Sequence, residues 1–428
     1  MQTPVISVLA TVFFFCALVQ TFFAARILKI SDQLRPKHPA WARFFHFAGE
    51  PEIIFSLWAA SFMVVLMISW GFDESFHWLD QRNFSEAAFV VVIMVLASTK
   101  PITVLSEKII LGLSRFLPFS EPVAVYVTIL VAGPLLGSLI TEPAAMTISA
   151  LLLKGRILDP LKAQVPKRFF YVLLGTLFVN ISVGGTLTHF AAPPVLMVAR
   201  VWNWDTPFMF MNFGWKAMIA ILLNTALAAW MSRHTLALIG KEKTEPDETK
   251  RSIPAWITLA HLGFIALCIV GVHHPAFVIG LFLIFLGFYD ITRDHQSRVK
   301  IEESILVGFF LGGLVILTAK QGWWLSPILR SIENLTLYMG TLFLSPITDN
   351  AAMTSLASQV EGLSEGSKYL IVAGAVVGGG LTIIANAPNP AGFALLRGSL
   401  PSKRLSPKHL FLGGLPPTLI AAVIFYLL

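Results

Sequence analysis

The segment Leu-Ile-Thr-Glu-Pro-Ala-Ala-Met-Thr at residues 139–147 recurs as Pro-Ile-Thr-Asp-Asn-Ala-Ala-Met-Thr at residues 346–354. Each copy carries one acid, Glu142 or Asp349, at the same place in an otherwise apolar motif. A charge at the centre of a membrane helix costs about 2.5–3.5 kcal/mol even on lenient scales. Two such acids indicate a function, although each also precedes an apparent helix start, where a carboxylate serves as a structural cap.

The composition around these motifs is that of a membrane protein. Hydrophobic residues make up 56% of the 428 residues and charged residues 13%, and the mean hydropathy is +0.74. This excludes an ordinary soluble protein and predicts an all-α polytopic membrane protein embedded in a lipid bilayer. The net charge of +7 comes from short loops between apolar runs, which favours the positive-inside rule over a nucleic-acid partner. Cys16 and Cys268 lie in apolar segments and indicate neither a disulfide framework nor a zinc site.

We expect about ten transmembrane helices, because about 20 apolar residues cross a bilayer. The expected spans are 4–28, 52–71, 86–105, 168–199, 212–233, 255–271, 275–291, 302–320, 367–396 and 408–428. Two further apolar stretches, 121–153 and 333–360, are interrupted in the middle by Gly, Pro and polar residues. Their halves look too short to span, so we interpret both as re-entrant hairpins, which require surrounding protein or a watery cavity.

Loop charge supports this topology. Most Lys and Arg residues fall in loops that the hairpin model places on one side, at 26–43, 154–168, 233–251, 293–300 and 397–408, with a weaker segment at 108–115. Those loops are the cytoplasmic ones if both termini lie outside the cytoplasm. If the hairpins were full spans, the basic loop 154–168 would lie outside. The first span, 4–28, is expected to be a retained helix rather than a signal peptide.

The repeat extends beyond the acidic motif. Val-Leu-Ala-Ser-Thr-Lys at 95–100 resembles Val-Ile-Leu-Thr-Ala-Lys at 315–320, and Gly-Gly-Thr-Leu-Thr at 184–188 resembles Gly-Gly-Gly-Leu-Thr at 378–382. The two copies start on opposite sides of the membrane, which predicts an inverted-topology repeat of the kind found in secondary transporters. The predicted first repeat is 1–240, with scaffold helices 4–71 and core 86–233, and the second is 252–428, with scaffold helices 255–291 and core 302–428.

The two Gly-rich breaks and the hairpin tips carry the candidate site. Carboxylate, amide, hydroxyl and freed carbonyl oxygens suit a hard cation, with Glu142 and Asp349 as the Na⁺ candidates. The predicted cation- or proton-binding residues are Glu142, Asp349, Thr141, Thr348, Asn350, Asn180, Thr186, Thr188, Thr382 and Asn386. The alternative for the glycines is close helix packing through small residues.

Lys100 and Lys320 are matched lysines within or near the ends of spans. They are charge partners of the two acids, contacts for an anionic substrate, or side chains that snorkel to the interface. Glu50 and Glu52 border a span, and we expect both at the membrane interface.

At its two acidic motifs the chain resembles the ion transporter superfamily, in particular a branch of sodium/proton antiporters. The motifs that carry the resemblance are Thr-Glu-Pro-Ala-Ala-Met and Thr-Asp-Asn-Ala-Ala-Met, and it covers about 86–428 by motif and the rest by helix order. It implies two five-helix halves with re-entrant hairpins, a bacterial inner (plasma) membrane location, and a homodimer through the scaffold helices. Related dicarboxylate carriers have Ser-Asn-Thr hairpin tips, so the acids here favour a cation over a carboxylate substrate.

Two functions follow from this sequence. The first is a sodium (cation)/proton antiporter that works by alternating access, with transported Na⁺ and H⁺ and no cofactor. The second is a proton- or sodium-coupled symporter or permease for a small anion. An enzyme is not expected, since the sequence has no His-Glu-x-x-His zinc motif and no Ser/His pairing in a nucleophile context. Broken, repeat-related helices also argue against a continuous channel pore.

Overall fold

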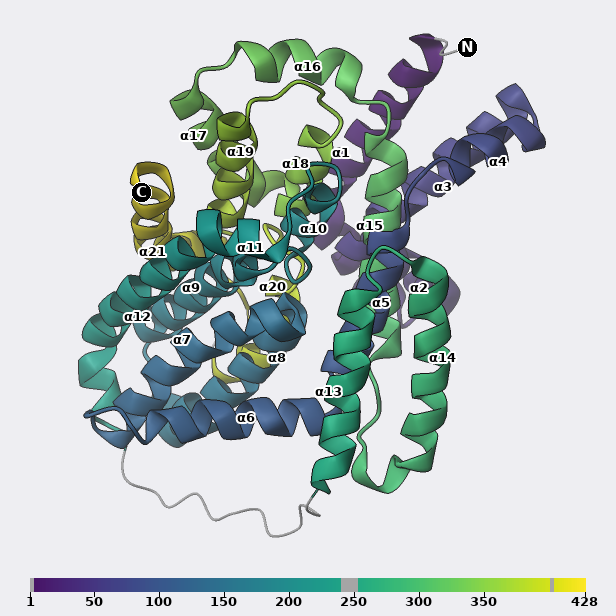
Figure 1. The fold of residues 1–428 in the computed structure, drawn as a ribbon. Coiled ribbons are helices and arrows are strands. Elements are labelled where there is room, and N and C mark those ends of the chain that lie inside the picture. The colour runs from purple at the N-terminus through teal and green to yellow at the C-terminus, as the bar shows by residue number, and fades with distance from the viewer. Residues whose placement is uncertain (1–3, 240–252, 401–403) are drawn as a thin grey trace.

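The computed structural model describes residues 4–239, 253–400 and 404–428, and within them the only regular structure is helical (Figure 1). Seven of these helices are long and apolar enough to cross a membrane, or eight if one bent pair is counted as a single span. The predicted class, an all-α polytopic membrane protein, is therefore confirmed. The basic linker 241–251, which we used in the topology argument, lies outside the described residues.

The helices of the first half end before the linker. They are α1 (Pro4–Leu34), α2 (Pro39–Gly49), α3 (Pro51–Trp70), α4 (Phe72–Asp80), α5 (Ser85–Ala97), α6 (Lys100–Ser114), α7 (Glu121–Ile140), α8 (Glu142–Leu153), η1 (Lys154–Leu158), η2 (Asp159–Gln164), α9 (Lys167–Gly184), η3 (Gly185–Leu187), α10 (Pro193–Ala199), α11 (Thr206–Met209), η4 (Phe210–Gly214) and α12 (Trp215–Leu236).

The helices of the second half follow the linker. They are α13 (Ala255–Val270), α14 (Pro275–Ile291), η5 (Arg293–His295), α15 (Ile301–Thr318), α16 (Gly322–Ser331), α17 (Asn334–Thr348), α18 (Asn350–Ala357), α19 (Glu365–Gly378), α20 (Asn389–Leu396), η6 (Arg397–Ser399) and α21 (Pro407–Leu427). Both predicted Gly breaks are present, because α9 ends at Gly184 and α19 ends at Gly378.

The expected continuous span 86–105 is wrong. The chain bends by 69° between α5 and α6. The hydroxyls of Ser98 and Thr99 donate to the carbonyls of Val95 and Leu96, which satisfies the end of α5. Pro101 then lies in the first turn of α6. The N–H group that proline lacks would have no acceptor within the helix at this position. Local hydrogen bonding thus ends one helix and starts another within a uniformly apolar run.

One hairpin limb is longer than we expected. Helix α7 has 20 residues and is apolar enough to cross a membrane on its own, so our argument that neither limb could span fails for this one. Helix α14 has the bounds of the predicted span 275–291, and α13 ends one residue before the end of the predicted span 255–271. With 17 and 16 residues, both are shorter than the seven helices that are long enough to cross a membrane.

The helices form two groups (Figure 1). Helices α1, α3, α5, α13, α14 and α15 pack on one another in one group, and α7 to α12 with α17 to α21 make up the other. We call these the scaffold group and the core group. Helices α5 and α15, which we had grouped with the cores, pack against α3, α13 and α14 instead. Helix α6 crosses one end of the molecule and α16 crosses the opposite end.

Helix α9 is the centre of the core group. It is buried along nearly its whole length and packs against α7, α12 and α21. A Cβ on Gly175 would overlap the backbone of Gly413 and Gly414 in α21, so both partners need glycine at this crossing. This close packing fixes the position of α9 against α21.

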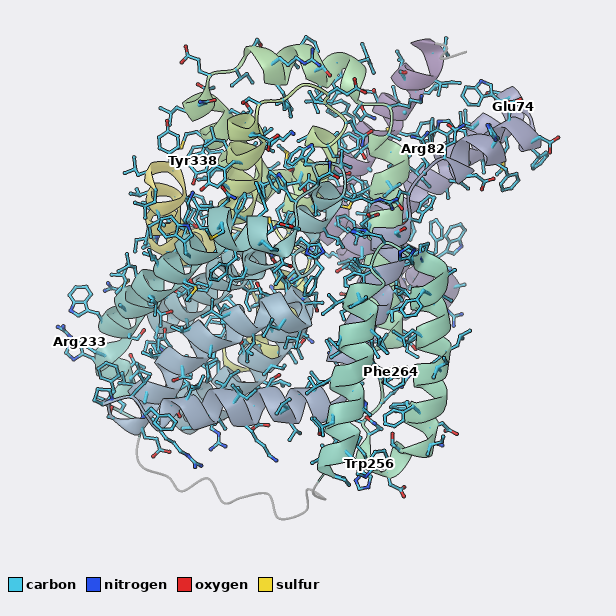
Figure 2. All side chains as sticks on the ribbon, viewed as in Figure 1. Glu74, Arg82, Arg233, Trp256, Phe264 and Tyr338 are labelled. Atoms are coloured by element: carbon cyan, nitrogen blue, oxygen red, sulfur yellow. The ribbon has the colours of Figure 1, made fainter. Side chains whose placement is uncertain are left out.

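The exterior is largely apolar. Large side chains such as Trp256, which is 58% exposed, point away from the protein, as expected for helices that face lipid. Figure 2 shows Trp256 near one end of α13.

Candidate functional site

Each hairpin turns at a single residue with a left-handed backbone. Thr141 joins α7 to α8 with φ 87°, and Asp349 joins α17 to α18 with φ 85°. The residue after each turn donates its N–H to a carbonyl in the broken segment of the same half. Glu142 N bonds to Ala191 O at 3.4 Å, and Asn350 N bonds to Ala385 O at 3.0 Å.

These matched bonds correct our pairing of the two acids. In three dimensions Glu142 corresponds to Asn350, and Asp349 corresponds to Thr141. The physical reason lies in the turn. Asp349 stays at the N-cap of α18 because its short side chain accepts backbone N–H groups, whereas Glu142 is the first residue of α8 and its longer side chain extends away from the helix end.

Glu142 is fully buried and reaches into the other half of the chain. Its Oε2 accepts a hydrogen bond from Asn386 Nδ2 at 2.8 Å, and its Oε1 has no hydrogen-bond partner among the described residues. A Cβ on Gly185 would overlap Oε1, so the glycine break makes room for this carboxylate.

Asn350 occupies the matching place in the second hairpin. It is also fully buried, and its Nδ2 donates to Ser182 Oγ at 3.4 Å. A Cβ on Gly379 would overlap Ser182 and crowd Asn350, as one on Gly185 would overlap Glu142. Both hairpin tips therefore meet the last turn of α9 between Ser182 and Gly185.

Asp349 faces a different neighbour, the scaffold group. Its Oδ1 accepts from the N–H groups of Ala351 and Ala352, at 2.8 and 3.3 Å, so the structural capping role is present. Asp349 also lines a cavity of about 30 Å³ together with Glu52 and Asn386. Glu142 does not line this cavity, but Asn386 lies between them and contacts both regions.

Buried oxygen atoms without hydrogen-bond partners gather at these tips and breaks. Among the described residues they include Thr141 Oγ1, Glu142 Oε1, Asn350 Oδ1, Asn386 Oδ1 and Asn389 Oδ1. An unpaired buried oxygen is costly, and carboxylate, carboxamide and hydroxyl oxygens are the donors that hard cations prefer. The donor set fits a hard cation.

A family model described as "Putative Na+/H+ antiporter" matches residues 5–428. The chain belongs to this family. A comparison with curated proteins gave no match. Membership places the chain among transporters rather than enzymes, and with its apolar helices makes it an integral multi-pass membrane protein.

Several residues that we predicted as cation ligands use their side-chain hydroxyls for hydrogen bonds to backbone carbonyls. Thr188 Oγ1 donates to Ser138 O and Thr382 Oγ1 donates to Pro346 O, both at 2.7 Å, so each ties a broken segment to its hairpin. Thr186 Oγ1 bonds within its own turn, to Val183 O.

The other hydroxyl and amide candidates are similarly engaged. Thr348 Oγ1 donates to Leu344 O, although Thr348 also lines the cavity beside Asp349. Asn180 bonds to Leu130 O and Thr225 through its nitrogen and accepts from Asn224 through its oxygen. With every polar atom of Asn180 paired, this residue joins α9 to α7 and α12.

The structure does not place the two lysines beside the acids. Lys100 is the first residue of α6, and Lys320 follows α15, within electrostatic range of Arg82. In the described part of the chain, no ion pair joins either lysine to Glu142 or Asp349. The charge-partner hypothesis therefore gains no support from the geometry.

Sequence reasoning missed two residues that lie at the hairpin tips and the adjoining cavity. Ser182 was not singled out, although it lies two residues before the Gly break at Gly184 and donates its hydroxyl to Val376 O in the second half. Glu52 was assigned to the membrane interface, yet it lines the same cavity as Asp349. The available signal was an acid in the first turn of a long apolar helix.

Proposed function

We propose that this protein exchanges Na⁺ or Li⁺ for H⁺ by alternating access, with Glu142 as the acid that both ions share. The observation that carries the proposal is the environment of Glu142. One oxygen of this buried carboxylate is held by Asn386 from the other half of the chain, and the other has no protein partner among the described residues.

A buried carboxylate explains why the two ions compete. An isolated charge in an apolar interior is strongly disfavoured, so Glu142 is stable there only with a proton or with a bound cation. One carboxylate cannot carry both at once. If the site faces one side of the membrane at a time, each cation that leaves is replaced by a proton, and exchange follows.

Asn350 and Thr141 would complete the cation's oxygen shell, while Asn386 holds the carboxylate through its nitrogen. Asn350 and Thr141 each have a buried oxygen without a partner in the described structure, at or next to the two tips that meet on α9. Asp349 would assist from the cavity side. The arrangement of α6 and α16 at opposite ends of the molecule supports an inverted repeat, which is the architecture that allows two alternating pathways to one site (Figure 1).

The test is exchange in proteoliposomes that hold a pH gradient and a pH-sensitive dye. Wild-type protein should dissipate the gradient on addition of NaCl or LiCl but not choline chloride. Glu142→Gln keeps the shape of the side chain but loses its charge, and should abolish this response. Glu121→Gln is the matched control, because Glu121 is an exposed acid in the first turn of α7. No cation response of the wild type at any pH would refute the proposal.

The alternative, a symporter or permease for a small anion, is decided by a parallel assay. It requires uptake of a labelled anion that is lost in Lys320→Ala, without exchange of Na⁺ for H⁺.

A further inference from the structure

A small cavity lies where the scaffold group meets the second hairpin. Thr21 of α1, Glu52 of α3 and Phe310 of α15 line it from the scaffold group. Asp349 and Asn386 line it from the core group. Its volume of about 30 Å³ accommodates an ion or a few water-sized molecules, since one water needs about 10–15 Å³.

Two acidic residues, Glu52 and Asp349, line this cavity. The charges of Glu52 and Asp349 are close enough to interact. In the described part of the chain no Lys, Arg or His pairs with Glu52, whereas its neighbour Glu50 lies 3.3 Å from His46. Like charges that face each other across a small apolar-walled space repel strongly, because the low dielectric of the interior does not screen them.

The carboxamide of Asn386 is a third polar group at this cavity, and its unpaired oxygen indicates a ligand. Asn386 is 1% exposed and its Oδ1 has no hydrogen-bond partner among the described residues, while its Nδ2 is already donated to Glu142. Two carboxylates, a carboxamide oxygen and the hydroxyl oxygens of Thr21 and Thr348 supply oxygen donors in a lining that is otherwise apolar. This is the donor chemistry of a hard cation.

We propose that Glu52, Asp349 and Asn386 form a second cation site, which bridges the scaffold and core groups and is distinct from the Glu142 site. It deepens the proposed antiport function and rests on it for its role in transport. A cation bound there holds the two groups together through ligands from each. Asn386 contacts both sites, so an ion can pass from Glu52 and Asp349 to Glu142, and its departure frees the core group to move.

The first experiment measures binding without transport. Purified protein in detergent is heated at increasing NaCl or LiCl, with choline chloride holding the ionic strength constant. A ligand that binds only the folded state raises the melting temperature. We expect Glu52→Gln to need at least tenfold more Na⁺ than wild type for half of the maximal shift. Glu50→Gln, which changes the adjacent acid outside the cavity, should behave as wild type.

The outcomes separate this inference from the proposed function. If wild type is stabilised by Na⁺ through Glu52 but exchanges no protons, the second site stands and the antiport proposal fails. If wild type exchanges Na⁺ for H⁺ while Glu52→Gln matches it in both exchange and Na⁺ stabilisation, the second site is refuted. Loss of stabilisation in Glu142→Gln but not in Glu52→Gln would also refute it.

A variant that keeps the negative charge tests the proposal if Glu52→Gln does not fold. If Glu52→Gln cannot be purified as a folded protein, Glu52→Asp is measured instead. Its shorter carboxylate should shift the Na⁺ concentration for half-stabilisation and change the Li⁺/Na⁺ preference. An unchanged dependence on both ions would overturn the proposal.

Discussion

Glu142 and Asp349 differ in the hydrogen bonds that their carboxylate oxygens accept from the protein. One oxygen of Asp349 caps α18, while Glu142 makes one side-chain hydrogen bond and has a free second oxygen. The acids are therefore not interchangeable, despite their matching places in the motif. Glu142 is suited to bind an ion, and Asp349 serves both as a cap and as a charge at the cavity.

The dual role of Asp349 can be separated by two substitutions. Asparagine caps a helix about as well as aspartate, whereas alanine in place of a cap costs about 1 kcal/mol. We expect Asp349→Asn to retain the melting temperature in choline chloride and to lose at least tenfold in exchange rate. Asp349→Ala should lose both. Thermal unfolding alongside the proteoliposome assay checks this, and a fully active Asp349→Asn would show that the charge is not needed.

Gly185 is a second test at the residue scale. A Cβ there would overlap Glu142 Oε1, so Gly185→Ala should push the carboxylate out of place and reduce exchange at least tenfold. The control is Gly280→Ala in α14, where an added Cβ meets nothing within 4 Å. The same dye assay compares the two. Equal activity would mean that Glu142 tolerates displacement.

At the scale of elements, close helix crossings hold the broken helices in position. The core group depends on α9, and α9 depends on α21, where Gly175 faces Gly413 and Gly414. Helix α9 ends at the Gly184 break, so contacts along its remaining length must fix its position.

Gly175→Ala should therefore destabilise the protein. Overpacking of a close contact costs about 1–3 kcal/mol, and here the neighbouring atoms are backbone, which cannot rotate away. We expect a melting temperature several degrees below that of wild type. Gly263→Ala in α13, which has open space around the added Cβ, should show no decrease. A wild-type melting temperature for Gly175→Ala would mean that α9 and α21 can separate without penalty.

At the scale of the whole molecule, alternating access requires the two helix groups to move relative to each other. One contact between them is a hydroxyl pair. Thr318 Oγ1 of α15 lies 2.9 Å from Ser355 Oγ of α18, and both side chains are buried. Cysteines at these places have sulfur atoms within reach of a disulfide.

A Thr318→Cys/Ser355→Cys protein, with Cys16 and Cys268 replaced by alanine, should cross-link on oxidation. We expect oxidation to stop exchange and dithiothreitol to restore it, because the bond ties the core group to the scaffold group. Each single-cysteine variant is the control and should be insensitive to oxidant. If the cross-linked protein exchanges at the full rate, transport does not involve movement at this contact.

Local patterns in the sequence predicted much of this protein. The apolar lengths gave most spans, the glycine pairs gave the ends of α9 and α19, and the repeated motif located both turns. These features depend on hydrophobicity and backbone preference over a few residues, which a sequence displays directly. The 69° bend between α5 and α6 is also local, but its signal, a Ser-Thr-Lys-Pro run at 98–101, is weak within an apolar segment.

The sequence by itself determined that this is a membrane protein with two acid-bearing motifs and two broken helices. Only the tertiary structure decided that Glu142 corresponds to Asn350, that Asn386 holds Glu142, and that Glu52 lines the same cavity as Asp349. The physical reason is distance along the chain. Periodicity and propensity act between neighbouring residues, whereas these contacts join residues far apart in sequence, and which oxygens remain unpaired depends on how the two helix groups pack.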